Sequence, residues 1–193
     1  MKSGKVIIIG GNKRAGKTTL SLKLHKNYQF NYYNFDMLLD SLEESLPILN
    51  DKDDSKYIAL LESMVKRSLL DAENYGINSV YEYIFTPENL ANFKYRNDVQ
   101  IIFLANLDAN IDNIASDLKT YSQKFDWPSY VSDEDINRNI KWILNQNEEL
   151  ITECKEYGFN LINTSRGENR DKIINNIINN LLEGNYEDNC TSK

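Results

Sequence analysis

Short apolar segments alternate with stretches of helical periodicity along most of this chain. The five apolar segments lie at residues 6–9, 31–35, 79–85, 99–104 and 159–162. Apolar residues recur at helical spacing in the stretches at 19–24, 37–46, 55–75, 109–121, 136–157 and 173–181. Strands that alternate with helices are typical of a parallel sheet covered on both faces. The pattern therefore predicts an α/β fold in three layers, with a five-stranded parallel sheet between helices.

Glycine residues and polar clusters mark the boundaries of these segments. Gly76 and Gly158 follow two long helical patterns, at positions where a helix commonly ends. The chain has no internal repeat and no linker long enough to divide it. We therefore predict a single domain at 1–184 and a polar tail at 185–193. The irregular stretch at 122–131 is predicted to belong to a small lid at about 119–140.

The first apolar segment leads into the sequence GNKRAGKT at 11–18. The spacing G-x-x-x-x-G-K-S/T, between a strand and a helix, lets a glycine-rich turn direct backbone N–H groups at phosphate oxygens. Gly11 and Gly16 permit the backbone angles of the turn, Lys17 reaches the β and γ phosphates, and the Thr18 hydroxyl holds Mg²⁺. The predicted nucleotide contacts in this loop are Gly11, Asn12, Lys13, Arg14, Ala15, Gly16, Lys17, Thr18 and Thr19.

Two carboxylates stand in or just after apolar segments, near the strand ends where ligands bind in sheets of this kind. Asp36 closes the second segment and is the predicted base for an acceptor hydroxyl; alternatively, it caps the following helix. Glu82 lies inside the third segment. If buried, it needs a partner such as Lys17, a Mg²⁺-bound water or the acceptor; alternatively, it occupies a partly exposed strand position. No apolar run ends in the usual pattern of four apolar residues and Asp, so Thr18, Asp36 and Glu82 are the predicted metal-binding residues.

Phosphoryl transfer also requires a cation near the transferring group, and the predicted lid supplies candidates. Among its basic residues we select Lys124 and Arg138 as predicted catalytic residues, together with Lys17 and Asp36. Arg166 follows the fifth apolar segment and is predicted to flank the nucleotide base. Each of these lid or loop cations could instead be a solvated surface charge. The tyrosines of the apolar segments, Tyr32, Tyr33, Tyr81 and Tyr83, are expected to pack within the sheet.

Composition narrows the choice of partners. The chain has 22 Lys and Arg residues against 29 Asp and Glu residues, for a formal net charge of −7. Nucleic-acid binders neutralise backbone phosphates with clustered basic residues, so a nucleic-acid partner is disfavoured. Two distant cysteines, Cys154 and Cys190, are typical of reduced thiols. No stretch approaches the roughly 20 apolar residues that span a bilayer, and the run at 6–9 is too short for a signal-peptide core. We expect a cytoplasmic protein without a membrane partner.

Three stretches resemble the P-loop small-molecule kinases. They are the loop at 11–18, the segment NFDMLL at 34–39 with its end at Leu46-Pro47, and YEYIFTP at 81–87. The layout is most similar to the chloramphenicol phosphotransferase and zeta-toxin branch, with shikimate and adenylate kinases further off. The resemblance implies a sheet with the first strand central, ATP with Mg²⁺ as donor, and a lid between the fourth and fifth strands. It also implies that Asp36 matches the acceptor base of the antibiotic-phosphorylating relatives.

The sequence therefore predicts an ATP-dependent phosphotransferase that acts on a hydroxyl or phosphate of a small-molecule acceptor. The alternative is a nucleotide-binding regulatory module with little kinase activity, in which ATP orders the lid for a partner protein. The lid lacks the arginine pair common in adenylate kinases, and the second segment lacks the Asp-x-Asp of shikimate kinases. Neither of those two activities is assigned, and both the acceptor and the oligomeric state are left open.

Overall fold

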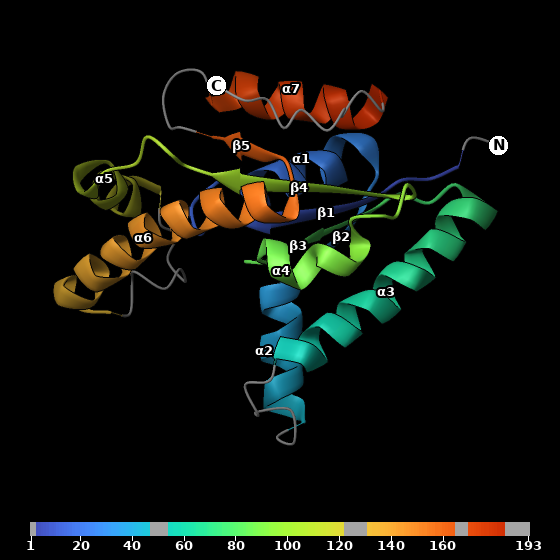
Figure 1. Cartoon of the computed structure of the whole chain (residues 1–193), viewed down its shortest axis with the longest axis horizontal. Coiled ribbons are helices and arrows are strands. Elements are labelled where there is room, and N and C mark those ends of the chain that lie inside the picture. The colour runs from blue at the N-terminus through green and yellow to red at the C-terminus, as the bar shows by residue number, and fades with distance from the viewer. Residues whose placement is uncertain (1–2, 47–53, 122–130, 165–169, 184–193) are drawn as a thin grey trace.

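A five-stranded parallel sheet forms the centre of the computed structural model, which describes residues 3–46, 54–121, 131–164 and 170–183 (Figure 1). The strand order is β2-β3-β1-β4-β5. The strands are β1 (Val6–Gly11), β2 (Asn31–Asn34), β3 (Ser79–Glu82), β4 (Val99–Ala105) and β5 (Leu161–Asn163). Every pair of neighbouring strands is parallel. The predicted fold class is therefore confirmed, with the first strand at the centre.

The helices follow the strands in the predicted alternation. They are α1 (Lys17–Tyr28), α2 (Phe35–Ser45), α3 (Asp54–Tyr75), α4 (Pro87–Leu90), α5 (Ile111–Tyr121), α6 (Asp133–Tyr157) and α7 (Arg170–Glu183), with a short 3-10 helix, η2, at Ala91–Phe93. Two helix ends lie where glycine predicts them. The backbone N–H of Gly76 bonds Ala72 behind α3, and Gly158 takes a left-handed conformation behind α6.

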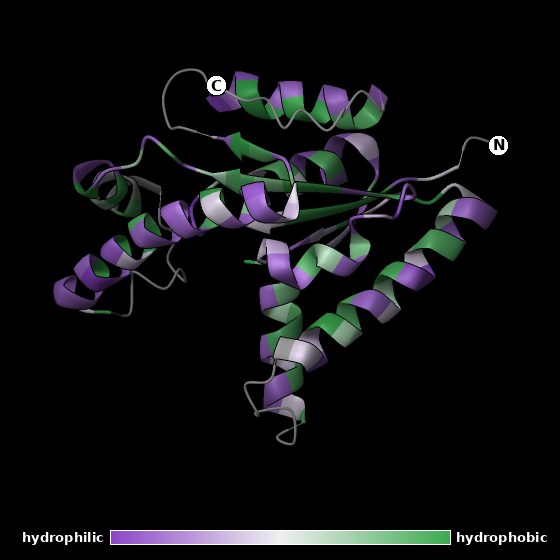
Figure 2. Cartoon of the chain, viewed as in Figure 1, coloured by the Kyte–Doolittle hydropathy of each residue, from purple (hydrophilic) through white to green (hydrophobic). Residues whose placement is uncertain are grey.

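Alternate residues of the central strand supply the two faces of the sheet. Ile7 and Ile9 pack with apolar residues of α1 and α7, whereas Val6 and Ile8 pack with those of α2, α3 and α6. Figure 1 shows α1 and α7 on one side of the sheet and α3, α4 and α6 on the other. In Figure 2 the apolar residues of α7 lie on the side of the helix that faces the sheet. Both faces of β1 are thus covered, which fixes the loop that follows it.

Two apolar segments end earlier as strands than their sequence indicates. The third segment reads as apolar to Phe85, but β3 ends at Glu82. The second segment ends at Asn34, and Phe35 already belongs to α2. The side chain of Asn34 accepts a hydrogen bond from the backbone N–H of Met37 at 2.9 Å, which caps α2 and stops the strand.

Several predicted features lie outside the described residues. These are most of the irregular lid stretch with Lys124, the position of Arg166, and the tail at 185–193. The described ends of the predicted lid are the end of α5 and the start of α6. Within the described part of the chain, none of the helices combines the length and apolar character needed to cross a membrane.

Candidate functional site

The phosphate loop joins the central strand to α1, and neighbouring strands hold it on both sides. Gly11 has a φ of 109°, and a Cβ at this position would collide with the carbonyl group of Leu104 in β4. Its N–H bonds the carbonyl oxygen of Phe85 at 3.2 Å, and the N–H of Asn12 bonds that of Leu104 at 3.1 Å. The start of the loop therefore requires glycine and has a fixed path.

The end of the loop leaves the start of α1 open to an anion. Gly16 precedes the helix with a φ of 91°, and no side chain caps the helix at this position. The first turn of α1 contains no acidic residue. Backbone N–H groups at a helix start lack partners within the helix and attract negative charge. The loop and helix together have the arrangement that the motif predicts for a phosphate site.

Lys17 is buried under this loop. Its Nζ donates a hydrogen bond to the carbonyl oxygen of Asn12 at 2.8 Å. Burial lowers the pKa of Lys17 to about 8, although the negative charges of Glu82 and Asp36 oppose this shift. The amine therefore lies in a poorly hydrated place within electrostatic reach of two carboxylates, where an added phosphate would stabilise its charge.

The pKa of Lys17 predicts a pH dependence of nucleotide binding. As the pH rises through about 8, the amine of the free protein loses its proton, so ATP affinity should fall. Binding at that pH should take up about half a proton per site, because phosphate raises the pKa again. Calorimetry of ATP binding in two buffers of different ionisation enthalpy measures this uptake. An equal heat in both buffers, with an affinity that does not change across this range, would contradict the prediction.

The same pKa shift has the opposite effect on the free protein's stability. The unfolded chain, with a lysine pKa of 10.5, binds more protons between about 8 and 10.5 than the folded chain does. The contribution of Lys17 to the free energy of unfolding therefore rises with pH through this window. If ATP affinity falls in this pH range, titration of Lys17 has not caused the fall by unfolding the protein.

Glu82 is the buried carboxylate nearest to the loop's threonine. It ends β3, directly beside Ile9 of β1, and is only 2% exposed. The hydroxyl group of Thr18 donates to its two carboxylate oxygens, at 3.0 and 3.1 Å. Of the two interpretations of Glu82 from the sequence, a buried carboxylate with a partner is therefore correct, and a partly exposed strand position is not. Its contact with Lys17 acts through charge, and its hydrogen bonds come from other residues.

The pair of Thr18 and Glu82 fits the oxygen chemistry of Mg²⁺. The Thr18 hydroxyl donates its hydrogen bond to Glu82, so its oxygen lone pairs are left for a cation. Mg²⁺ usually takes one or two protein ligands and completes its shell with water and phosphate oxygens. Among the described residues there is no group of three or more His, Cys, Asp or Glu side chains that could hold a metal alone. A cation here would therefore need the nucleotide as well.

Asp36 lies in the first turn of α2, on the solvent-exposed side. It does not cap the helix, because Asn34 does so two residues earlier. Partial desolvation by the surrounding protein raises the pKa of Asp36, and Asp40 adds to this effect, whereas Lys17 and Lys13 oppose it. The electrostatic interaction with Lys17 places this carboxylate beside the phosphate loop and open to an incoming molecule.

Helix α6 contacts the loop through two side chains that the sequence analysis did not select. The buried Asn147 accepts a hydrogen bond from the Asn12 side chain at 2.8 Å and donates to the carbonyl oxygen of Asn106 at 2.9 Å. The Lys13 ammonium lies 5.2 Å from the centre of the Trp142 ring. The helix that follows the predicted lid therefore rests directly on the phosphate loop.

Two residues that directly follow β5 or begin α7 contact the loop as well. The buried Thr164 donates its hydroxyl proton to the carbonyl oxygen of Ala15 at 2.6 Å. The Arg170 guanidinium donates to the carbonyl oxygen of Arg14 at 3.2 Å and lies against Gly16. For Thr164 the available indication was a polar residue just after a strand, since strand ends carry the site in this fold; Arg170 begins α7 and has no such indication.

The remaining predicted residues lie further from this arrangement or outside the described chain. Arg138 is 74% exposed and pairs with Asp135 of its own helix at 3.1 Å. Thr19 is exposed in the first turn of α1. Lys124 and Arg166 lie outside the described residues. The structure thus brings Lys17, Thr18 and Glu82 together, with Asp36 in electrostatic contact, and does not bring Arg138 to them.

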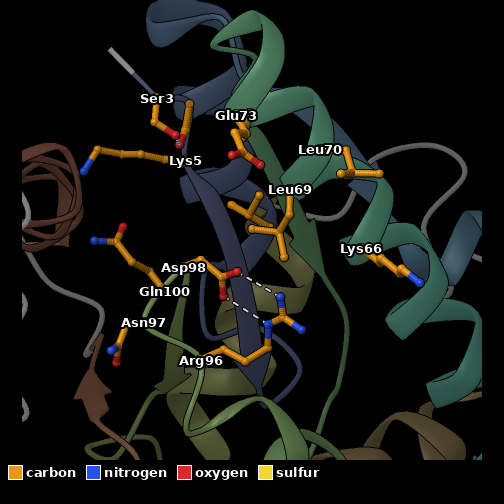
Figure 3. Close-up of a pocket in the computed structure, with 13 residues that line it drawn as sticks. Ser3, Lys5, Lys66, Leu69, Leu70, Glu73, Arg96, Asn97, Asp98 and Gln100 are labelled. Carbon is orange, nitrogen blue, oxygen red and sulfur yellow. Dashed lines mark hydrogen bonds and ion pairs between the residues drawn. The ribbon is translucent and has the colours of Figure 1, made fainter. Parts of the chain in front are cut away.

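A cavity of about 720 Å³ lies near the amino ends of β1 and β4, at the end of the sheet opposite the phosphate loop (Figure 3). It is lined by residues around the start of β1 and β4 and by the C-terminal half of α3, including Val6, Gln100 and Glu73. Arg96 and Asp98 form an ion pair at 2.8 Å in its wall. Because the phosphate loop follows the carboxyl end of β1, this cavity is separate from the site described above.

Comparison with known proteins supports a kinase fold. The sequence matches no protein-family model and no curated protein. The fold is similar to shikimate kinase from Bacteroides thetaiotaomicron, with a TM-score of 0.54, 18% identity, and coverage of 93% of this chain and 98% of that one. It is also similar to a gluconokinase from Sinorhizobium meliloti, with a TM-score of 0.53, 11% identity, and coverage of 95% and 94%.

A third similar structure is shikimate kinase from Acinetobacter baumannii in complex with shikimate. Its TM-score is 0.52 at 15% identity, and the match covers 96% of each chain. At these identities the comparison shows the fold alone. The chain has the fold of the P-loop small-molecule kinases, as the sequence resemblance predicts. The finer placement beside chloramphenicol phosphotransferase and zeta toxin stays a prediction.

Proposed function

We propose that this chain is a phosphotransferase that moves the γ-phosphoryl group of Mg-ATP to a hydroxyl or phosphate of a small-molecule acceptor. The observation that carries the proposal is the hydrogen bond from Thr18 to the buried Glu82, beside Lys17 and at the end of a phosphate loop. Such a cluster of charge is costly to bury in a protein that binds nothing there. The kinase fold supports the same function.

On the donor side, the described residues would hold the triphosphate of ATP and restrict its rotation. Backbone N–H groups between Gly11 and Thr18 would bind phosphate oxygens, and Lys17 would bind the β and γ phosphates. Thr18 and Glu82 would hold Mg²⁺, the first directly and the second through the Thr18 hydroxyl or a water. When bound, Mg²⁺ neutralises charge on the transferring phosphoryl group.

On the acceptor side, Asp36 would serve as the base. As the acceptor oxygen attacks the γ phosphorus, its O–H bond breaks and the proton passes to the Asp36 carboxylate, while ADP leaves with the electrons of the broken P–O bond. The raised pKa makes this carboxylate a better proton acceptor than an ordinary aspartate. An acceptor phosphate that is already ionised would not need this step.

The lid cations and the base contact belong to the proposal as well. Lys124 and Arg138 would approach the transferring group from the predicted lid, and Arg138 would first have to leave Asp135. Arg166 would flank the nucleotide base. The reaction would take place in the cytoplasm.

The test is ADP release from Mg-ATP across a panel of acceptors. The panel contains nucleosides, sugar nucleotides, phosphorylated metabolites, hydroxylated organic acids, and aminocyclitol or phenicol antibiotics. The expected result is stimulation by one chemical class well above the rate without acceptor. Saturable ATP binding with no stimulation by any class would overturn the phosphotransferase assignment.

That negative result would favour a second function, a nucleotide-regulated binding module. The contacts from Asn12 to Asn147 and from Lys13 to Trp142 support this alternative, because occupancy of the loop would act directly on α6. It predicts tight ATP binding, little turnover, and a change in protease cleavage between α5 and α6 when nucleotide binds.

A further inference from the structure

We infer that Tyr32 and Asn34 are positioning residues that orient the Glu82 carboxylate toward the metal site and connect it to the helix that carries Asp36. The inference rests on the proposed function, because it assigns how that site holds its cation. The two residues come from β2, which lies on the far side of β3 from the phosphate loop's strand.

Both residues donate to the same oxygen of Glu82. The Tyr32 hydroxyl donates to Oε1 at 2.5 Å, and the Asn34 Nδ2 donates to Oε1 at 3.1 Å. Asn34 also donates to the Tyr32 hydroxyl oxygen at 3.1 Å. Among the described residues, Oε2 receives only the Thr18 hydroxyl, which it shares with Oε1. A carboxylate oxygen has two lone pairs, so Oε1 is saturated and Oε2 keeps capacity on the side of Thr18.

The sheet register brings this arrangement about. Asn34 pairs with Glu82 across the parallel strands β2 and β3, and Tyr32 lies two residues earlier, on the same face. A phenol is protonated at neutral pH, so the Tyr32 hydroxyl acts as the donor in its hydrogen bond to Glu82. Glu82 therefore has a permanent donor that fixes its orientation whatever the ligand.

Asn34 has a second contact that links the metal site to the acceptor side. Its Oδ1 accepts the backbone N–H of Met37 at 2.9 Å, while its Nδ2 reaches Glu82. Asp36 stands in the turn that this contact caps. One side chain thus holds the Glu82 carboxylate and the turn that carries Asp36 in a fixed position relative to each other.

A purely structural role makes a different prediction. A buried carboxylate needs hydrogen-bond donors for stability alone, so loss of a donor would then lower the melting temperature and leave ligand binding unchanged. The measurement that separates the two roles is the affinity for ADP with and without Mg²⁺, which requires no turnover.

The first experiment compares Tyr32→Phe with Tyr33→Phe in the full chain. Tyr33 is the adjacent tyrosine and stacks on Tyr81 at 4.7 Å between ring centres. Tyr33→Phe therefore removes a tyrosine hydroxyl from the same strand and leaves the contact of Tyr32 with Glu82 in place, which makes it a matched control. We expect Tyr32→Phe to weaken Mg-ADP binding about tenfold, with metal-free ADP binding unchanged, because the Glu82 carboxylate loses the donor that orients it toward the metal site. Tyr33→Phe should bind both as the wild type does.

The second experiment separates the two contacts of Asn34. Asn34→Ser keeps an acceptor for the cap of α2 but is too short to reach Glu82, whereas Asn34→Ala loses both contacts. In the serine variant, the gain in ADP affinity that Mg²⁺ produces should be about tenfold smaller than in the wild type. The alanine variant should show the same loss and should also melt at a lower temperature.

The outcomes distinguish this inference from the proposed function. If Mg²⁺ raises the ADP affinity of the wild type, and raises that of Tyr32→Phe and Asn34→Ser by the same factor, the inference is overturned and the phosphotransferase proposal stands. If the wild type binds no nucleotide in either condition, the proposed function is overturned, and the inference with it. The inference is supported if Mg²⁺ raises the ADP affinity of Tyr32→Phe and Asn34→Ser by a smaller factor than it does for the wild type and for Tyr33→Phe.

Discussion

Lys17→Ala should weaken ATP binding by roughly a hundredfold or more, because the phosphate loop loses the charge that pairs with the β and γ phosphates. The substitution should leave the fold intact. Burial lowers the pKa of Lys17, so the charged amine costs the free protein stability at neutral pH, and its removal relieves that cost. The intrinsic fluorescence of Trp142, beside Lys13 in the loop, offers a direct binding signal.

Lys26→Ala is the matched control for this variant. Lys26 is an exposed lysine in the last turn of the same helix, so the control removes one positive charge from α1 away from the loop. We expect its ATP affinity to stay within a few-fold of the wild type. Equal affinity for ATP in Lys17→Ala and Lys26→Ala would show that the loop does not bind the phosphates of the nucleotide.

Asp36→Asn should reduce acceptor-dependent turnover by roughly 10² to 10⁴ while ATP affinity changes little, if the acceptor is a hydroxyl compound. The amide keeps the size of the carboxylate but takes no proton at neutral pH. Asp36 is in the first turn of α2 and does not cap the helix, so the melting temperature should stay near that of the wild type.

Asp40→Asn provides the control for charge on the same helix. Asp40 lies one turn beyond Asp36 and raises its pKa, so the variant removes an equal charge without removing the base. Turnover within a few-fold of the wild type is expected. An equal loss in Asp36→Asn and Asp40→Asn would mean that the net charge of α2 matters and that Asp36 is not the base.

The sequence was sufficient where local chemistry decides the structure. Gly11 and Gly16 both take positive φ values, as a turn that binds phosphate requires. The alternation of apolar segments and helical patterns predicted five parallel strands, and the long apolar run at 99–104 proved to be a strand, β4. Such features depend on residues close to one another in the chain.

The network around Glu82 could not be predicted in the same way. Tyr32 reads as a packing residue of an apolar segment, and its hydroxyl contact with Glu82 joins residues 50 positions apart. That contact depends on which strand lies beside β3, and periodicity does not determine strand order. Asn34 and Asp36 are both suitable caps before the same helix, and only the structure shows that Asn34 takes the role.

Following the γ-phosphoryl group of ATP shows whether this chain is a phosphotransferase. ATP labelled at the γ phosphate would be incubated with Mg²⁺, the full chain and the acceptor class that best stimulates ADP release. We expect the label to appear on the acceptor at the rate at which ADP forms, and Asp36→Asn to slow both together for a hydroxyl acceptor. Label recovered only as ATP or as free phosphate, while that acceptor stimulates ADP release, would show that the chain hydrolyses ATP and is not a small-molecule kinase.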